Sequence, residues 1–186
     1  MKKIGVLDIQ GSVAEHCEML LELGVDFVRV KNVEDLEGLD GLIMPGGEST
    51  TIGKLLGIYG LGEAIKARVK EGMALWGTCA GAILMAKKVE GGEVEGLKLM
   101  DIVISRNAYG RQVDSFECEL EFGVAGEKES PGIAAVFIRA PKIVSVGKGV
   151  EVLARHNGEI VAAREGRMLV TTFHPEMTGD LTVHQW

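Results

Sequence analysis

The chain has 186 residues, of which 27 are acidic and 20 basic, so its formal net charge at pH 7 is −7. This length predicts one domain with a sizeable buried core, and the negative charge argues against a surface for nucleic-acid phosphates or anionic lipid. The three cysteines are too few and too scattered for a disulfide framework or a metal site. We therefore expect a metal-free protein of a reducing, cytoplasmic compartment. The chain opens into a core strand at Lys3 and has no apolar run near the ~20 residues of a membrane span, so we expect neither signal peptide nor membrane helix.

The first half of the chain alternates between strand and helix patterns. Apolar spacing predicts strands over 3–9, 26–30, 41–44 and 73–76, and helices over 13–23, 50–56, 61–71 and 80–87. Such alternation implies right-handed crossovers and a parallel sheet that is covered on both faces. Sheets of this kind bind ligands at the carboxyl ends of their strands, so we expect the site there.

The second half is rich in short strands, predicted over 101–106, 115–122, 134–138, 143–146, 150–155, 160–164 and 168–173. Asn157-Gly158 between two of them is a strong hairpin signal, which predicts an antiparallel portion. The composition shows no linker between the halves. We predict a single domain over 1–186 of the α/β class, a flavodoxin-like three-layer α/β/α fold with a parallel central sheet and a small antiparallel extension.

The most informative segment is MALWGTCAGAIL, residues 73–84, an apolar strand followed by a glycine-flanked corner and an apolar helix. Gly77 and Gly81 let strand and helix approach closely, so Cys79 is held in a cramped turn with its thiol presented at the sheet edge, not buried. The N-terminus of the helix favours the thiolate. We interpret Cys79 as a nucleophile, whereas Cys17 and Cys118 read as small core or strand residues.

A cysteine nucleophile needs a base, and His174 ends a predicted strand at the segment FHPE, residues 173–176. Residues two apart in extended chain point the same way, so Glu176 is predicted to reach the imidazole. Cys79, His174 and Glu176 would then form a relay in which the histidine moves the proton and the carboxylate orients it. The alternatives His16, His156 and His184 lack such a carboxylate, and we interpret them as structural or solvent-facing.

A third element is the strand at 41–44, which runs into Gly46-Gly47 and a capped helix. Exposed N–H groups of Gly47, and of Ala80 after the nucleophile, are candidate donors of an oxyanion hole. The alternative interpretation, a turn with Ser49 as N-cap, is compatible with this role.

The segments PGGEST (45–50), GTCAG (77–81) and FHPE (173–176) resemble the triad-type, class I glutamine amidotransferases. The segments RNAYGRQVDSFE (106–117) and VFIRAP (136–141) make the chain similar to one branch, the glutaminase subunits of pyridoxal 5′-phosphate synthase. The likeness runs almost from end to end, beginning at Ile4 and including Gln10-Gly11. One departure is Asp8, where that family usually has a small residue.

The resemblance implies that L-glutamine is hydrolysed to L-glutamate and ammonia through a thioester on Cys79, without a cofactor. It also implies a partner, a (β/α)8-barrel synthase subunit that consumes the ammonia within a hetero-oligomer during vitamin B6 biosynthesis. In that family the glutaminase is weakly active until it docks, and the loop at Gln10 is a candidate sensor of docking. The implied glutamine contacts are Gly47, Glu48, Ser49, Arg106, Ile138 and Arg139.

Four alternatives stay open on the sequence alone. Arg106 and Arg139 each end an apolar strand, where a solvated charge competes with a carboxylate-binding role. Arg111 and Gln112 are candidates for a partner surface. The whole chain could instead be a cysteine hydrolase or stress-response protein with another small substrate, or an interaction module that keeps the fold without the chemistry; the intact triad disfavours the module.

Overall fold

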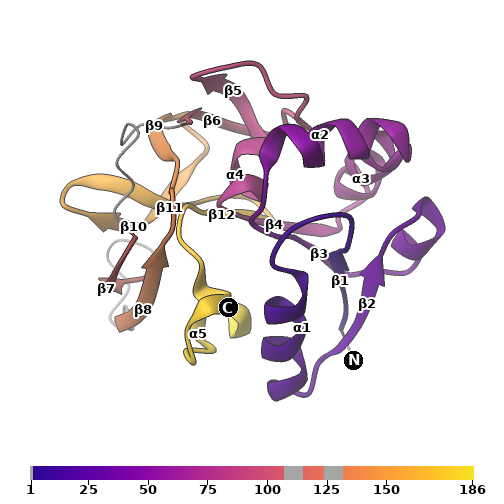
Figure 1. Cartoon of the computed structure of the whole chain (residues 1–186), viewed down its shortest axis with the longest axis horizontal. Coiled ribbons are helices and arrows are strands. Elements are labelled where there is room, and N and C mark those ends of the chain that lie inside the picture. The colour runs from indigo at the N-terminus through magenta and orange to yellow at the C-terminus, as the bar shows by residue number, and fades with distance from the viewer. Residues whose placement is uncertain (1, 107–114, 124–131) are drawn as a thin grey trace.

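The structure is a computed structural model that describes residues 2–106, 115–123 and 132–186, and its elements are labelled in Figure 1. Five parallel strands form one half of the main sheet, in the order β2-β1-β3-β4-β12. These strands are β1 (Lys3–Leu7), β2 (Asp26–Val30), β3 (Gly41–Met44), β4 (Ala74–Thr78) and β12 (Met168–Thr171).

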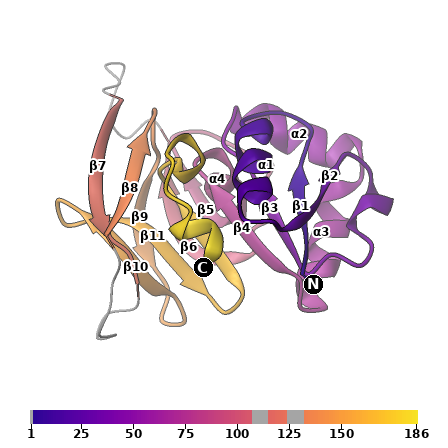
Figure 2. The ribbon, with the colours of Figure 1, turned by 90° about the horizontal axis from the view of Figure 1, so that it is seen from below.

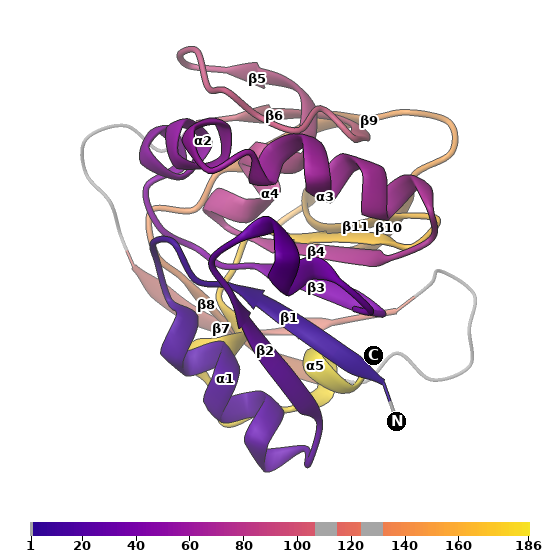
Figure 3. The same cartoon turned by 90° about the vertical axis from the view of Figure 1, so that its right-hand side faces the viewer.

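Helices cover both faces of this parallel half, because the connections between successive parallel strands run over one face of the sheet or the other. On one face lie α1 (Val13–Glu22) and α5 (Thr182–Gln185), and on the other α2 (Ser49–Ile58), α3 (Leu61–Lys70) and α4 (Ala80–Met85). Figure 3 shows the two layers of helices on either side of the strands. Two short 3-10 turns, η1 (Val33–Leu36) and η2 (Pro175–Met177), complete the connections.

The sheet continues beyond β12 with strands of mixed direction, so it is mixed and strongly curled. The pairs β12-β11, β11-β9 and β9-β6 are antiparallel, and β6-β5 is parallel, while β10 pairs with β11. A separate antiparallel sheet consists of β7 and β8, which lie at one side of the molecule in Figure 2. The strands are β5 (Ala86–Glu90), β6 (Met100–Ser105), β7 (Phe116–Glu121), β8 (Gly132–Phe137), β9 (Lys142–Val146), β10 (Glu151–His156) and β11 (Glu159–Glu165).

The predicted fold class is confirmed in its coarser form, an α/β protein with an added antiparallel sheet. The expectation of a parallel central sheet is wrong for its second half, because β9 and β11 join the main sheet in antiparallel register and do not form a separate extension. The hairpin prediction is confirmed: Asn157 and Gly158 join β10 to β11 with φ of 48° and 83°, as a type I′ turn requires.

The end of one predicted helix is a strand in the structure. The helix expected over 80–87 stops at Met85, and Ala86–Glu90 forms β5. Ala86 and Lys88 pair with Met100 and Val103 of β6, so sheet pairing overrides the helix propensity of the alanine and lysines.

No helix within the described ranges is long and apolar enough to span a membrane.

Separate clusters of apolar side chains hold the layers together. The main cluster packs α2, α3 and α4 on the sheet, and a second fills the space between β7-β8 and the curled strands around the fully buried Phe122 and Phe173. A smaller cluster, which includes Val6, Cys17 and Leu20, fixes α1 to β1 and β3. The parallel strands that end at the candidate site are therefore supported on both faces.

Candidate active site

Cys79 occupies the corner between β4 and α4, in a conformation that few side-chain-bearing residues adopt. Its φ is 47° and its ψ −100°, a combination that is strained for any residue but glycine. The Cys79 N–H donates to the Thr171 carbonyl at 2.9 Å, and its own carbonyl accepts from the Ile83 N–H at 3.2 Å. These bonds to β12 and α4 hold the corner in place.

The close strand-to-helix approach predicted from the glycines is confirmed. A Cβ on Gly77 would lie 2.5 Å from the carbonyl carbon of Gly81, and one on Gly81 would lie 2.1 Å from the Met44 carbonyl oxygen. The expectation of an uncovered thiol is wrong, since Cys79 is only 8% exposed. Its Sγ lies 4.0 Å from the Ile138 carbonyl oxygen, so the segment after β8 covers it.

His174 and Glu176 lie together beside this corner. The His174 N–H donates to the Val136 carbonyl at 2.8 Å, and Nδ1 of its ring is 2.8 Å from Oε1 of Glu176. The pairing is as predicted, but its local geometry differs: β12 ends at Thr171, and Glu176 lies in the 3-10 turn η2, which Pro175 begins. The turn, and not an extended chain, brings the carboxylate back to the imidazole.

The two groups stabilise each other's charged forms. Burial alone would lower the pKa of His174, but hydrogen bonds and charge interactions with Cys79 and Glu176 outweigh it and raise the pKa to about 10. Burial alone would raise the pKa of Glu176, but the His174 hydrogen bond and the nearby histidines hold it at about 2. Because Nδ1 of His174 is engaged by Glu176, Nε2 is the nitrogen left to face the Cys79 sulfur.

Several side chains around Glu176 were not predicted as part of the site. Ser12 Oγ donates to Glu176 Oε1 at 2.8 Å, and His16 Nε2 lies 3.6 Å from Oε2. His184 of α5 is 2.9 Å from the His16 ring, so both histidines interpreted as structural or solvent-facing belong to this cluster. The sequence does carry a signal for His16, because it lies on the apolar stripe of α1 that also includes Val13.

The loop at Gly46 and Gly47 lies against the same residues. A Cβ on Gly46 would be 2.4 Å from Cε1 of His174 and 3.4 Å from the Cβ of Cys79. The Gly46 carbonyl accepts from the Ser12 N–H at 3.0 Å, and in a trans peptide the Gly47 N–H then points away from Ser12. Ala80 is the first residue of α4, so its N–H has no acceptor within the helix.

Glu48 and Arg106 meet at the start of α2. The Glu48 carboxylate caps this helix by accepting from the N–H groups of Thr50 and Thr51 and from the Thr51 hydroxyl, and these bonds lower its pKa to about 2. Nη2 of Arg106 lies 3.8 Å from Glu48 Oε1 and 3.3 Å from Thr50 Oγ1. The observed cap of α2 is therefore Glu48, and the interpretation of Ser49 as the N-cap is wrong, because Ser49 is a buried residue of the helix itself.

The remaining candidate residues are less closely joined. Ile138 and Arg139 follow β8, with Ile138 next to Cys79 and Arg139 exposed at a φ of 45°. Arg111 and Gln112 lie outside the described residues. The negative charge of Asp8, the residue at which the chain departs from the family pattern, is paired locally. Its carboxylate lies 2.8 Å from Arg29 Nε and 3.4 Å from Lys31 Nζ.

The other two cysteines have the surroundings expected of structural residues. Cys17 is buried in the cluster under α1, and burial raises the pKa of its thiol. Cys118 of β7 is partly exposed, with Sγ 3.5 Å from Nδ1 of His156, and burial raises the pKa of its thiol as well. Neither lies at a strand-to-helix corner.

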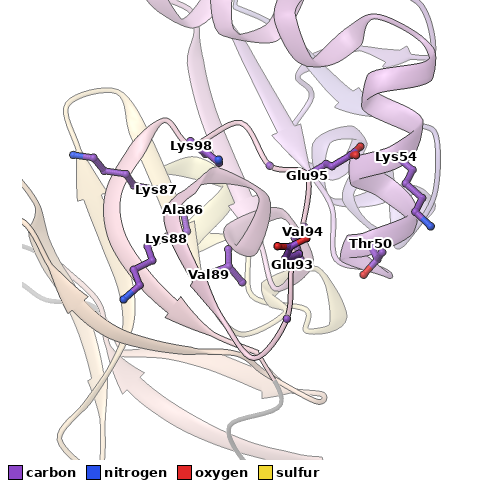
Figure 4. A pocket seen from close by; sticks show the side chains of 12 residues that line it. Thr50, Lys54, Ala86, Lys87, Lys88, Val89, Glu93, Val94, Glu95 and Lys98 are labelled. Carbon is purple, nitrogen blue, oxygen red and sulfur yellow. The ribbon is translucent and has the colours of Figure 1, made fainter.

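A hollow of about 930 Å³ opens beside the Arg106 end of this region. Figure 4 shows Thr50 and Lys54 of α2 on one side of it and Lys87 and Lys88 of β5 on the other. Its lysines face solvent together with Glu93 and Glu95, so its charges are mixed.

Comparison with known proteins identifies the family. The model of the SNO glutamine amidotransferase family matches residues 6–186. The chain belongs to this family. Proteins similar to this chain include one of Herpetosiphon aurantiacus, 54% identical over 186 residues, covering 98% of this chain and 96% of that one. Another, from Carboxydothermus hydrogenoformans, is 49% identical over 184 residues, covering 99% and 95%. Both are named pyridoxal 5′-phosphate synthase subunit PdxT.

Solved structures agree with this family assignment. A crystal structure described as a glutamine amidotransferase superposes with a TM-score of 0.90 at 48% identity, covering 98% of this chain and 95% of that one. The structure of PurLQS from Thermotoga maritima superposes with a TM-score of 0.73 at 14% identity, covering 94% and 88%. The second likeness concerns the fold alone. The curled mixed sheet is thus the fold of an SNO glutamine amidotransferase.

Proposed function

We propose that Cys79, His174 and Glu176 hydrolyse the side-chain amide of L-glutamine, as nucleophile, general base and orienting carboxylate. The observation that carries the proposal is the arrangement at one corner of the sheet: Cys79 is held at a φ of 47° against a histidine whose other nitrogen is 2.8 Å from a buried carboxylate. A glutaminase of this family needs all three groups, and a structural cysteine would need none of them.

The chemistry proceeds in two halves. The Cys79 thiol gives its proton to Nε2 of His174, and the sulfur attacks the amide carbon of glutamine. The imidazolium then gives that proton to the departing nitrogen, which leaves as ammonia while a glutamyl thioester remains. In the second half His174 takes a proton from water, the hydroxide attacks the thioester, and glutamate leaves with the Cys79 thiol restored. Glu176 stabilises the imidazolium in both halves.

Charge develops on the amide oxygen in each tetrahedral state, and we assign its donors to the N–H groups of Gly47 and Ala80. Ala80 supports this role because it begins α4 and has no intrahelical acceptor. Gly47 supports it because the loop around Gly46 packs on His174 and Cys79. The Gly46 carbonyl is already held by Ser12, which fixes the plane of this peptide.

Recognition of glutamine is assigned to residues at the start of α2, at the end of β6 and after β8. Arg106 supplies a positive charge for the α-carboxylate, and Glu48 a negative charge for the α-amino group. Their ion pair, with 3.8 Å between the nearest atoms, would be shared with the substrate when it binds. The other proposed contacts are Gly47, Ser49, Ile138 and Arg139.

The ammonia is used in pyridoxal 5′-phosphate synthesis, the process for which the relatives are named. We infer that the chain passes it to a (β/α)8-barrel synthase subunit within a hetero-oligomer, because ammonia released into water is protonated and lost.

We also propose one flavodoxin-like domain over 1–186, supported by the family match over 6–186. A cytoplasmic location, for which the free cysteines are the support, stays a prediction.

The decisive experiment measures ammonia and glutamate released from glutamine by the purified chain, with and without a purified barrel subunit. We expect low turnover alone, a rise in kcat on mixing, and none from Cys79→Ala. Cys17→Ala is the matched control, since it removes another buried thiol, one that lies in the cluster under α1 and not at the strand-to-helix corner, and it should retain turnover. Parental ammonia release by Cys79→Ala would refute the nucleophile assignment, and full activity without the partner would favour a free-standing hydrolase.

A further inference from the structure

Glu176 has a carboxylate oxygen that the proposed relay does not use. Oε1 accepts both from Ser12 Oγ and from the His174 ring, each at 2.8 Å. Oε2 is buried and has no hydrogen-bond partner among the described residues. An ionised oxygen in such a place costs free energy unless a dipole or charge is directed at it. The group directed at it is the imidazole of His16, whose Nε2 lies 3.6 Å away.

His16 is completely buried and held from three directions. Its Nδ1 is 2.9 Å from Nε2 of His184, and its Nε2 is 3.3 Å from the Thr78 hydroxyl as well as near Glu176. The ring of Trp76 contacts both histidines edge to face, with centroids 5.4 Å from His16 and 4.8 Å from His184. Residues of α1, β4, η2 and α5 therefore fix the orientation of this ring.

The contacts decide which nitrogen of His16 carries the proton. If Nδ1 carried it, the Nε2 lone pair would face the Glu176 carboxylate. The proton of His184 would then lie on its own Nδ1, which is buried and has no hydrogen-bond partner in the part of the chain that the structure describes. If Nε2 carries it, an N–H points at Thr78 and Glu176, and His184 Nε2–H donates to the His16 Nδ1 lone pair. The second arrangement leaves no buried N–H unpaired, and an orphan acceptor costs less than an orphan donor.

Both histidines are neutral in the folded protein at neutral pH. Burial lowers the pKa of His16, against the attraction of Glu176, and burial lowers that of His184 to about 3. A neutral His16 matters, because a cation there would pair with Glu176 and compete with the His174 imidazolium. The titratable and polar groups that face His16 from all the surrounding elements are Glu176, His174, His184, Glu15, Thr78 and Trp76.

We propose that His16, kept in its Nε2–H tautomer by His184, is a positioning residue of the hydrolysis. Its N–H dipole holds the second oxygen of Glu176 and favours the ionised carboxylate, so that Oε1 stays aligned on the His174 ring. His16 touches neither substrate nor thiol and transfers no proton. The inference rests on the proposed function, because it assigns His16 a task only if Glu176 orients His174.

Two substitutions of His16 distinguish the effect of losing its N–H donor from the effect of losing its packing. His16→Leu keeps a buried side chain but removes the dipole, whereas His16→Gln carries an amide N–H at a reach similar to that of Nε2. Leu20→Ala is the structural control: Leu20 is buried one turn further along α1 and packs in the same cluster as Cys17, and its side chain has no donor for Glu176. All variants are assayed for glutaminase kcat and KM between pH 5 and 9 with the barrel subunit present, and for thermal unfolding.

We expect His16→Leu to lower kcat by about 10- to 100-fold, the effect of losing a donor to a charged group, with KM little changed. His16→Gln should restore most of kcat, and Leu20→Ala should lower the unfolding temperature while keeping the parental kcat. A His16→Leu enzyme with the kcat of Leu20→Ala would overturn the inference.

A second measurement does not depend on any variant folding. Nitrogen-15 NMR of the histidine-labelled parent at pH 7.5 should show His16 as a neutral ring protonated on Nε2, and a ring protonated on Nδ1, or on both nitrogens, would also overturn the inference. Failure of the proposed function is distinct from these outcomes. It would appear as an inactive parent complex, or as an active Cys79→Ala complex, before any His16 variant is compared.

Discussion

The side chain of Gln10 is bonded to the loop that carries Gly47: its Oε1 accepts a hydrogen bond from the Glu48 N–H at 2.8 Å. The neighbouring Ser12 N–H donates to the Gly46 carbonyl at 3.0 Å. The loops after β1 and β3 are therefore joined by two hydrogen bonds directly beside Cys79. A partner that displaced Gln10 would change the environment of the peptides around Gly46 and Gly47, which include the proposed oxyanion donor.

Gln10→Met removes the acceptor at nearly constant size. We expect the rise of kcat on adding the barrel subunit to be blunted by about tenfold, less than the 10²–10³ that loss of an oxyanion donor itself costs. Alkylation of Cys79 by iodoacetamide should proceed at the parental rate, because the triad is untouched. A parental rise in kcat for Gln10→Met would remove Gln10 from the coupling between partner and site.

The conformation of Cys79 predicts an unusual order of stabilities. Strain of this kind costs about 1–3 kcal/mol for a residue with a Cβ, and glycine is free of it. Both Cys79→Ala and Cys79→Gly lose all glutaminase activity, yet Cys79→Gly should be the more stable of the two by about 1 kcal/mol. Urea unfolding of the two variants measures the difference. An alanine variant as stable as the glycine variant would show that the corner is not strained.

Gly46 is predicted to be intolerant of any side chain, because an added Cβ would lie 2.4 Å from His174 Cε1. Gly46→Ala must push the imidazole away from Cys79, and a misplacement of about 1 Å at a reacting group can cost about 100-fold in rate. Gly179→Ala is the matched control, since no atom of the described residues lies within 4 Å of its added Cβ. Steady-state kcat of both variants, with the barrel subunit present, checks the prediction, which parental turnover by Gly46→Ala would contradict.

The sequence alone was sufficient for the parts of the site that depend on local geometry. A glycine-flanked cysteine between strand and helix has few structural alternatives, so the corner at Cys79 could be predicted. The pairing of His174 with Glu176 was predicted as well, although the turn η2 produces it and not the extended chain that the spacing argument assumed. The sequence was not sufficient for the parts of the site that are formed by contacts between elements distant in the chain. Ser12, His16 and His184 come from α1 and α5 or the loop before them, and only the packing of these elements brings them to Glu176.

The same reason explains the errors in the fold. Residues 80–87 have the composition of a helix, and only pairing with β6 makes Ala86–Glu90 a strand. Strand periodicity was visible in the second half, but periodicity does not say which strand is the neighbour. The antiparallel register of β9 with β6 and β11 is set by long-range packing. Strand pairing of this kind cannot be derived from apolar spacing in a single chain.

The last prediction concerns acid stability. The folded pKa of His184 is about 3, below its ordinary 6.5, so between these values the unfolded chain binds a proton that the folded protein excludes. The free energy of unfolding is unaffected above pH 6.5 and falls as pH drops toward 3.

His184→Gln keeps a side-chain N–H donor for His16 but cannot titrate, so it should lose less stability than the parent between pH 7.5 and 5.5, by about 1 kcal/mol. Urea unfolding at both pH values measures this, and the comparison at pH 7.5, where the histidine is neutral in both states, isolates any packing change. Equal acid losses in the two proteins would mean that His184 is protonated in the folded state, which would also leave His16 without the neutral partner that fixes its tautomer.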